Sequence, residues 1–349
     1  MSNISAYAGI LNEIKQEIFT GRHKAILAAN KELILHYWSI GNIILRHQSS
    51  EGWGSKVIDK LARDLASEFP DSKGFSARNL KYMRRFAEEY ADLSFVQVVL
   101  AQITWYHIIT LTEKVSNLTE RNWYIAKTIE NGWSRNVLVH QIETKLYERQ
   151  SLVEKTTNFQ RALPSPQSEL ANETIKDPYI FDFITFREEM NEVDIEKQLV
   201  QQVTKLLLEF GTGFAFVGNQ VHLEIGEEDF YLDLLFYHTK LRCYVVIELK
   251  SGKFKPEYAG KLNFYLSAVD GQMKSEHDNP SIGIILCKEK NRIVAEYALK
   301  DMTKPIGVSE YKLLQEIPIA LKSSLPSIEE IEERLENKMG RTGGGREND

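Results

Sequence analysis

The chain has 349 residues, of which 43% are hydrophobic and 26% are charged. Both fractions are ordinary for globular proteins, so the composition excludes a disordered or fibrous chain, and the length predicts about two domains. The formal net charge of −6 excludes a protein that attracts nucleic acid over its whole surface. Contacts with nucleic acid are therefore expected only at local basic segments.

Neither a secretory signal nor a membrane span is expected. The first residues mix charged and apolar side chains, without a cationic segment that leads into a hydrophobic one. The longest apolar runs, such as residues 282–287, are far shorter than the roughly 20 residues that cross a bilayer. A cytoplasmic location is the default expectation. Cys243 and Cys287 lie inside apolar runs and form no CxxC pair, which predicts buried thiols rather than a disulfide or a zinc site.

Residues 1–150 are predicted to form a helical domain. Apolar side chains recur every three or four residues, for example at Ile10, Ile14 and Ile18, and the alternation typical of strands is nearly absent. Residues 56–69 and 77–90 form two such helices, separated by a short Pro- and Gly-containing turn, with Ser76 as the N-cap of the second. This order is typical of a helix-turn-helix.

Basic side chains of the second helix are the candidate nucleic-acid contacts. A similar helical pair at 119–132 and 134–150 adds one more, with Ser134 as its cap. The predicted contacts are Arg78, Lys81, Arg84, Arg85 and Arg135. A solvated face of an ordinary helical bundle would give the same pattern, because helix-turn-helix geometry is common outside nucleic-acid-binding proteins.

A change of composition predicts a second domain after a linker. Residues 151–172 are rich in Pro, Ser, Thr and Gln, which predicts the linker, and 173–325 mix helical and strand patterns, which predicts an α/β domain. Residues 326–349 are expected to form an acidic helix and a disordered Gly-rich tail. The expected elements of the α/β domain include helices at 193–210, 256–268 and 292–300, and strands at 230–237, 243–249 and 282–287.

The most informative stretch is a predicted β-hairpin with one carboxylate in each strand. Asp233 and Glu248 lie among apolar residues, where a carboxylate is costly to bury without a partner. If the hairpin turns between Lys240 and Leu241, the two carboxylates are equally distant from the turn, so they lie opposite each other on one face. A four-residue loop preserves this parity.

The residues that follow Glu248 complete a constellation suited to phosphodiester hydrolysis. Lys250 is expected on the same face as Glu248, and Leu249 on the other. Asp233, Glu248 and the Leu249 carbonyl are hard oxygen ligands for Mg²⁺, with Mn²⁺ as an alternative. Lys250 would orient or deprotonate the attacking water, a role that a lowered lysine pKa favours. A structural ion-pair network on the strands is the alternative explanation.

These residues resemble a known family. Asp233, followed after a hairpin by Glu248-Leu249-Lys250, resembles the signature of the PD-(D/E)xK nuclease superfamily, although Leu232 stands where the superfamily name has proline. The phrases GFAFVGNQ, VVIELKSGKFKPEYAGKLNFYL and NGWSRNVLVHQIE resemble the YhcG-type proteins of the DUF1016 family. This resemblance covers most of residues 10–320.

The resemblance implies further site residues and an activity. In this superfamily a helix before the core strands often carries an acidic residue of the site, and Glu196 is the residue that this implies here. The alternative is that Glu196 is an exposed helix residue without a role in the site. Asn263 and Tyr265 are in the region where the superfamily often has a glutamine and a tyrosine. The implied function is Mg²⁺-dependent hydrolysis of nucleic acid.

Several alternatives stay open from the sequence alone. DNA is expected as the substrate ahead of RNA, but the metal and phosphate chemistry of the two is shared. A protein that keeps the nuclease fold only for binding or assembly is the rival from another class. Endonuclease and exonuclease action, the recognised sequence or structure, and a homo-oligomeric state are left undecided.

Overall fold

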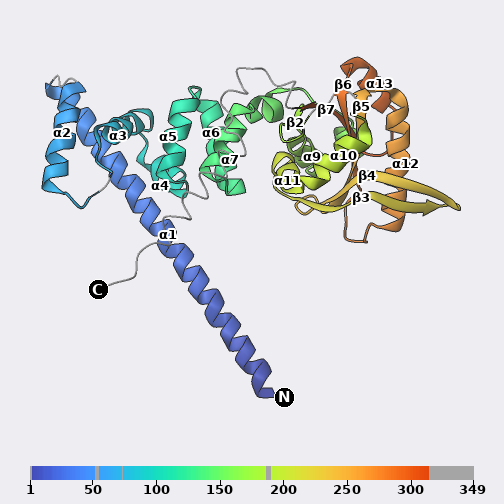
Figure 1. Cartoon of the computed structure of the whole chain (residues 1–349), viewed down its shortest axis with the longest axis horizontal. Coiled ribbons are helices and arrows are strands. Elements are labelled where there is room, and N and C mark those ends of the chain that lie inside the picture. Colours follow the sequence, from blue (N-terminus) through green and yellow to red (C-terminus); the bar gives the residue numbers. More distant parts are fainter. Residues whose placement is uncertain (1, 52–54, 73, 186–189, 314–349) are drawn as a thin grey trace, which may run out of the picture. The chain divides into compact units, whose positions relative to one another are not determined.

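The structure, a computed structural model, describes residues 2–51, 55–72, 74–185 and 190–313. The chain divides into two compact units, Met1–Ile142 and Glu143–Asp349 (Figure 1). The first is helical and the second mixes helices with a sheet, so the predicted fold class is confirmed. The predicted acidic helix and tail at 326–349 lie outside the described residues.

The first unit is built from helices alone among its described residues. They are α1 (Ser2–Glu51), α2 (Ser55–Glu68), α3 (Ala77–Glu89), α4 (Leu93–Val98), the short η1 (Leu100–Gln102), α5 (Trp105–Lys114), α6 (Leu118–Asn131) and α7 (Arg135–Glu143). In the described part of the chain no single helix is long and apolar enough to cross a membrane, and one bent pair, Leu93–Gln102 with Trp105–Lys114, passes by length and composition only.

Helix α3 packs closely against α1. Leu80, Met83 and Phe86 line its buried face. Gly41 of α1 permits the close approach, because a Cβ at this position would overlap the carbonyl oxygen of Met83. Ser76 caps α3 as predicted, with its side chain accepting a hydrogen bond of 3.3 Å from the backbone N–H of Asn79. Helices α2 and α3 therefore follow each other near the predicted residues, with Ser76 as the N-cap of α3.

The second unit surrounds a mixed sheet with helices. Its elements are η2 (Glu148–Leu152), β1 (Thr156–Thr157), α8 (Phe159–Ala162), α9 (Gln167–Thr174), β2 (Tyr179–Phe181), α10 (Glu192–Gln201), α11 (Val203–Phe210), β3 (Phe214–Ile225), β4 (Glu228–His238), β5 (Cys243–Lys253), α12 (Pro256–Gln272), β6 (Ile282–Glu289), α13 (Arg292–Leu299) and β7 (Ile306–Leu313). The strand order is β1-β7-β6-β5-β4-β3, with β2 also paired to β7. β3, β4 and β5 are antiparallel neighbours, whereas β5, β6 and β7 run parallel.

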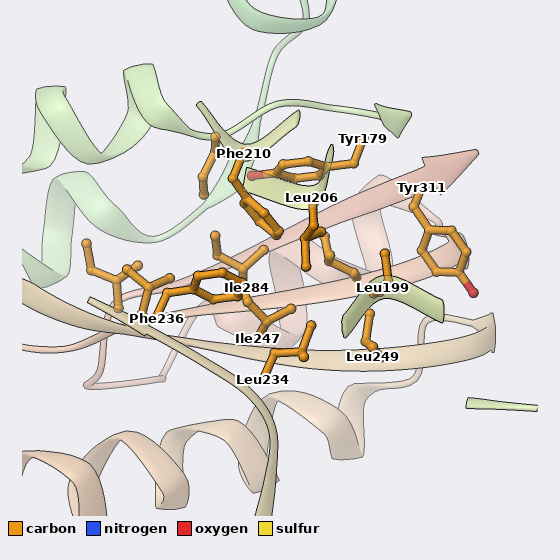
Figure 2. Packing of buried hydrophobic residues seen from close by; sticks show 14 of the residues in the cluster. Tyr179, Leu199, Leu206, Phe210, Leu234, Phe236, Ile247, Leu249, Ile284 and Tyr311 are labelled. Carbon is orange, nitrogen blue, oxygen red and sulfur yellow. The ribbon is translucent and has the colours of Figure 1, made fainter. Parts of the chain in front are cut away.

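Two apolar layers cover the sheet. Alternate residues of β5, including Ile247 and Leu249, pack with α10 and α11 on one face (Figure 2). The side chain of Val246 points to the opposite face of the sheet, where it packs with α12 and α13. β5 is consequently buried on both sides, which explains its nearly continuous apolar sequence. The helix predicted over 193–210 is in fact two helices, because the backbone of Gln202 is not helical and separates α10 from α11.

The segment predicted as a linker is part of the second unit. β1 pairs with β7, and Phe159 is completely buried in the core of this unit. Asn158 donates to two carbonyl groups in the turn before β7 and accepts from the backbone N–H of Ile306 at 2.7 Å. The prediction of a linker is wrong because β1, α8 and α9 are too short to show apolar periodicity, although they pack on the sheet.

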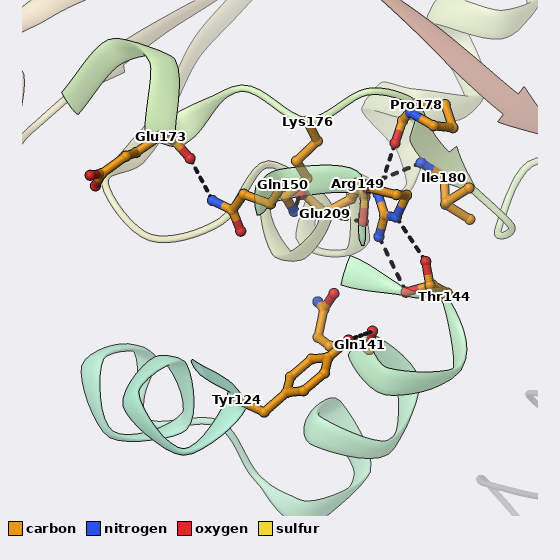
Figure 3. Close-up of polar contacts among 10 residues, drawn as sticks. All are labelled: Tyr124, Gln141, Thr144, Arg149, Gln150, Glu173, Lys176, Pro178, Ile180 and Glu209. Atoms are coloured by element: carbon orange, nitrogen blue, oxygen red, sulfur yellow. Dashed lines mark hydrogen bonds and ion pairs between the residues drawn. The ribbon is translucent and has the colours of Figure 1, made fainter. Parts of the chain in front are cut away.

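A buried ionic cluster ties the start of this unit to its core (Figure 3). The Arg149 guanidinium donates to the Glu209 carboxylate at 2.6 Å and to the Pro178 carbonyl at 3.0 Å. Lys176 donates to the backbone carbonyl of Glu209, and burial lowers the pKa of this lysine to about 8. Removing one partner from such a buried cluster typically costs about 3 kcal/mol. Residues just before 150 therefore belong to the second unit rather than to the helical one.

Candidate active site

The β4–β5 hairpin has the parity that places its two carboxylates on one face. The last pair before the turn is His238 with Cys243, which leaves a four-residue loop, and the ladder runs back to Leu234 paired with Ile247. Beyond that pair the Asp233 carboxylate accepts a hydrogen bond of 2.8 Å from the Leu249 backbone N–H. Where the two strands separate, a side-chain oxygen of Asp233 thus accepts the hydrogen bond that a backbone carbonyl of β4 would otherwise accept from β5.

Glu248 and Lys250 meet on the face that packs toward α12. The Lys250 ammonium lies 3.0 Å from Glu248 Oε1, and Lys261 of α12 donates to the same oxygen at 2.6 Å. Glu248 is fully buried, and its second oxygen, Oε2, accepts no hydrogen bond from any described residue. Leu249 points into the opposite layer, as predicted. The structure therefore brings together the three residues that the sequence singled out.

Glu192 is a member of this cluster that sequence reasoning missed. It is the first residue of α10, and its carboxylate accepts from Lys250 Nζ at 3.0 Å and from the Ser251 backbone N–H at 3.2 Å. The sequence does contain one indication of its position: Glu192 precedes Glu196 by one helical turn, so both side chains lie on the same helix face. The choice of Glu196 alone followed the family pattern rather than the geometry of the helix.

Glu196 is buried at the neighbouring strand, so the alternative of an exposed helix residue is wrong. Its carboxylate accepts from the side-chain amides of Asn219 at 2.9 Å and Gln220 at 2.5 Å. The register of β3 with β4 places Gln220 level with Asp233. Gln220 has a φ of 45°, a left-handed conformation that is rare for a residue with a side chain. Glu196 therefore holds an unusual backbone turn beside Asp233.

The two residues expected on α12 have different positions. Tyr265 is buried beside the cluster, with the Lys261 ammonium 5.1 Å from its ring centroid. Asn263 instead accepts a hydrogen bond of 3.1 Å from the Lys304 backbone N–H, in the turn before β7. The placement of Asn263 in the site is therefore wrong, because its side chain joins two structural elements. Lys261, one turn before Tyr265, faces the carboxylates in its place.

The surroundings of Lys250 and Asp233 raise the pKa of both side chains, with opposite consequences for their charge. Burial lowers the pKa of Lys250, but the carboxylates of Glu248, Glu192 and Asp233 outweigh burial, so this pKa is raised. A lowered pKa, which would favour deprotonation of the water by Lys250, is therefore absent, and Lys250 is held as an ammonium. Burial, reinforced by the charge of Glu248, raises the pKa of Asp233 from 3.8 to about 7.

The donor atoms fit a divalent cation. Within the described ranges no three His, Cys, Asp or Glu side chains are arranged to hold a metal, so the side-chain donors are the two carboxylates of Asp233 and Glu248. Mg²⁺ commonly binds one or two carboxylates and keeps several waters, so two are sufficient. A cation would give the buried Glu248 Oε2, which has no partner among the described residues, an interaction, and it would offset the burial and the Glu248 charge that raise the Asp233 pKa.

The raised pKa of Asp233 predicts how stability depends on pH. The folded protein retains a proton on Asp233 that the unfolded chain releases near pH 3.8, so metal-free stability should fall as pH rises toward about 7. Asp233→Asn keeps an acceptor for the Leu249 N–H and removes the charge. In EDTA at pH 8 we expect the variant to be more stable than wild type, with a free energy of unfolding that is larger by about 1–3 kcal/mol.

Denaturant titrations at pH 5 and pH 8 would measure this difference. Asp301→Asn, in an exposed turn after α13, is the matched control. Parallel pH profiles for wild type and Asp233→Asn would contradict the assignment of a buried, proton-retaining carboxyl.

The basic residues predicted to contact nucleic acid are paired inside the first unit. Arg84 and Arg85 form ion pairs one turn along α3, with Glu88 at 2.5 Å and Glu89 at 2.8 Å. Arg135 donates to Thr110 Oγ1 at 3.1 Å. The remaining two pair with acids of other helices, Arg78 with Glu113 and Lys81 with Asp59. The face therefore mixes both signs of charge.

Comparisons with known proteins identify both halves of the chain. A model of the DUF1016 N-terminal domain matches residues 13–149, and a model described as the YhcG PDDEXK nuclease domain matches 172–326. An Escherichia coli (strain K12) protein named "Putative nuclease YhcG" is 30% identical over 342 residues, covering 88% of this chain and 91% of that protein. The chain belongs to the YhcG family. Its α/β unit is a PDDEXK nuclease domain, a class of hydrolases that act on nucleic acids and typically use divalent metals.

Solved structures show partial likeness to this YhcG-family chain. A chain of the structure titled "Structure of EndoMS-dsDNA2 complex" matches 39% of this chain and 49% of its own, with 15% identity and a TM-score of 0.27. A repair endonuclease from Pyrococcus abyssi matches 38% of this chain and 50% of its own, with 15% identity and a TM-score of 0.25. The chain therefore spans about half the length of these solved chains.

Proposed function

We propose that the chain hydrolyses phosphodiester bonds of DNA with the help of Mg²⁺, with Mn²⁺ as a substitute. The observation that carries this proposal is the convergence of Asp233, Glu248 and Lys250 where β4 and β5 separate, with one buried Glu248 oxygen that accepts no hydrogen bond from the described residues. A purely structural ion-pair network does not explain why that oxygen is buried without a partner.

The chain's own residues have distinct parts in this chemistry. Asp233 and Glu248 would hold the cation, with the Leu249 carbonyl beside them, and the bound ion would polarise a phosphate oxygen and lower the pKa of a water. Lys250, held as an ammonium, would orient that water and stabilise the charge that develops on the phosphate. Glu192 positions the ammonium from the α10 side, and Tyr258 lies under it with its ring centroid at 5.2 Å.

Incubation of the purified chain with several substrates tests this proposal. Single-stranded, duplex and branched DNA and matched RNA should be compared in Mg²⁺, in Mn²⁺ and in EDTA, with a closed circular DNA to distinguish endonuclease from exonuclease action. We expect cleavage of DNA that EDTA abolishes. Cleavage of RNA alone would favour an RNA nuclease. Binding without cleavage of any substrate would favour a protein that keeps the nuclease fold for assembly.

We assign contacts with the DNA backbone to α3 of the helical unit. The ion pairs of Arg84 and Arg85 are partly exposed at the surface, where a pair typically contributes only about 0–1 kcal/mol, so a phosphate can replace the carboxylate partner of each arginine at low cost. The order of α2 and α3, with α3 capped by Ser76, supports a helix that lies along a groove.

A double substitution on α3 checks this assignment. Arg84→Ala with Arg85→Ala should weaken DNA binding and reduce the slope of log K against log salt by about 0.9 for each lost phosphate contact. Lys127→Ala, which removes an ion pair to Glu130 on α6, is the control. Binding isotherms at several salt concentrations provide the slopes, and slopes equal to wild type would mean that α3 is only a scaffold.

A further inference from the structure

The first half of α1 has an apolar face that its own unit leaves uncovered. The exposed fractions of three aliphatic side chains on this face, Leu11, Ile14 and Ile18, are 38%, 52% and 48%. The packing of α1 within its unit begins near Asn30, which donates to two carbonyl groups around η1. The sequence predicted an apolar helix face here, and the structure gives it no partner among the described residues of the first unit.

The exposed face follows the spacing of a coiled coil. Apolar or small residues recur at alternating intervals of four and three, and all of them lie within the described helix. They are Tyr7, Leu11, Ile14, Ile18, Gly21, Ala25 and Ala28. A heptad of this kind keeps one seam facing a partner helix over its whole length. The last three members are small, and a Cβ added at Gly21 would meet no atom within 4 Å, so the seam is open to close contact.

The face is not a continuation of the one that α1 buries in its own unit. Ile34, Tyr37 and Ile44 are buried there, as the core side of α1. At 3.6 residues per turn this core side is about 120° around the helix axis from the seam of Leu11, Ile14 and Ile18. Helix α1 therefore has two apolar faces, of which one packs within its own unit and the other has no partner among the described residues of that unit.

We infer that this seam pairs with the same seam of a second copy of the chain, as a parallel and in-register coiled coil. The seam is self-complementary, because in that register each residue meets its own equivalent. Leu11, Ile14 and Ile18 then form three layers of large side chains, and Gly21, Ala25 and Ala28 form layers of small ones. The inference concerns assembly and does not depend on the proposed nuclease chemistry.

The flanking charges favour the parallel arrangement. Lys15 and Arg22 border one side of the seam and Glu17 and Lys24 border the other, and all four are exposed. In the parallel register Glu17 of each copy lies beside Arg22 of the other, which gives two attractive pairs and no repulsive one. The antiparallel register would bring Lys15 of each copy beside Arg22 of the other and Glu17 beside Lys24, so its two like-charge pairs would offset its two attractive pairs.

The oligomeric state of the full chain tests this inference. Sedimentation velocity should give a dimer for wild type and a monomer for Ile14→Glu with Ile18→Glu, since two buried layers would then contain charges. Asn12→Glu with Gln16→Glu adds the same charges to the opposite side of the same helix and should remain dimeric. Unchanged circular dichroism and melting temperature would show that the variants fold.

A cross-link tests the orientation. Both native cysteines are buried, so in the variant Ile14→Cys the introduced thiol is the exposed one. Mild oxidation should link two copies through position 14 in high yield, because in-register residues of the seam face each other. A wild-type monomer, or a dimer that survives Ile14→Glu with Ile18→Glu, would overturn the inference. A dimer that forms no link through position 14 would overturn the parallel pairing.

Discussion

Glu248→Gln should reduce DNA cleavage at least about 10³-fold while leaving the chain folded. The substitution preserves the size of the side chain and an oxygen that can accept from Lys261, which donates to it at 2.6 Å. It removes the charge that would hold the cation, whose contribution of several kcal/mol to the transition state corresponds to roughly this factor. Single-turnover cleavage with excess enzyme, together with calorimetric titration of Mg²⁺, measures both losses.

Glu257→Gln is the matched control for this prediction. Glu257 is exposed in the first turn of α12, with 68% of its side chain accessible, and pairs only loosely with Lys255 at 3.7 Å. Its substitution should leave the rate within a few-fold of wild type. Cleavage by Glu248→Gln at the wild-type rate would remove the metal-site hypothesis, whereas an unfolded variant would indicate that the carboxylate is mainly structural.

Lys250→Met should separate binding from chemistry. Met retains an unbranched stem of similar length and loses the ammonium, so the variant should still bind Mg²⁺ and DNA. Its single-turnover rate should fall about 10²- to 10³-fold, the scale of one electrostatic stabiliser. Because the pKa of Lys250 is raised, its charge persists through neutral pH, so the wild-type rate should show no loss that follows lysine deprotonation between pH 7 and 9.

The comparison variant lies on the same strand. Lys253→Met, at the exposed end of β5, should cleave DNA at nearly the wild-type rate. If Lys250→Met also cleaves within a few-fold of wild type at saturating enzyme and Mg²⁺, the ammonium is merely a counter-ion of Glu248 and Glu192, and the catalytic assignment of Lys250 is wrong.

The core of the site could be predicted from the sequence because strand geometry is rigid. Successive side chains alternate between faces, so fixing the parity of one hairpin fixed the relation of Asp233 to Glu248 and of Glu248 to Lys250. The costly burial of two carboxylates among apolar residues supplied the reason to examine this hairpin. Long apolar strands and amphipathic helices were predicted for the same reason, since their periodicity is dictated by burial.

The contacts that failed prediction depend on how separate elements pack. Helical spacing places Glu192 on the face of Glu196, but its contact with Lys250 also requires the first turn of α10 to lie against the end of β5, which no local pattern specifies. Asn263 and Lys261 are two residues apart on α12, and the rotation of that helix decides which of them faces Glu248. The break at Gln202 depends on how α10 and α11 pack against the sheet, which the apolar pattern across 193–210 does not reveal.

The interweaving of residues 143–171 with the sheet changes where the enzyme could be cut from its neighbour. A fragment that begins at residue 172, where the nuclease-domain match starts, would lack β1 and leave the start of the β7 edge, at Gly307 and Val308, without its partner strand. It would also deprive Ile306 of the Asn158 acceptor and Glu209 of the Arg149 guanidinium. The boundary of the nuclease-domain match and the boundary of the compact unit that contains the sheet thus differ, at residues 172 and 143. An exchange of N-terminal modules between relatives preserves the sheet only when the junction lies before residue 143.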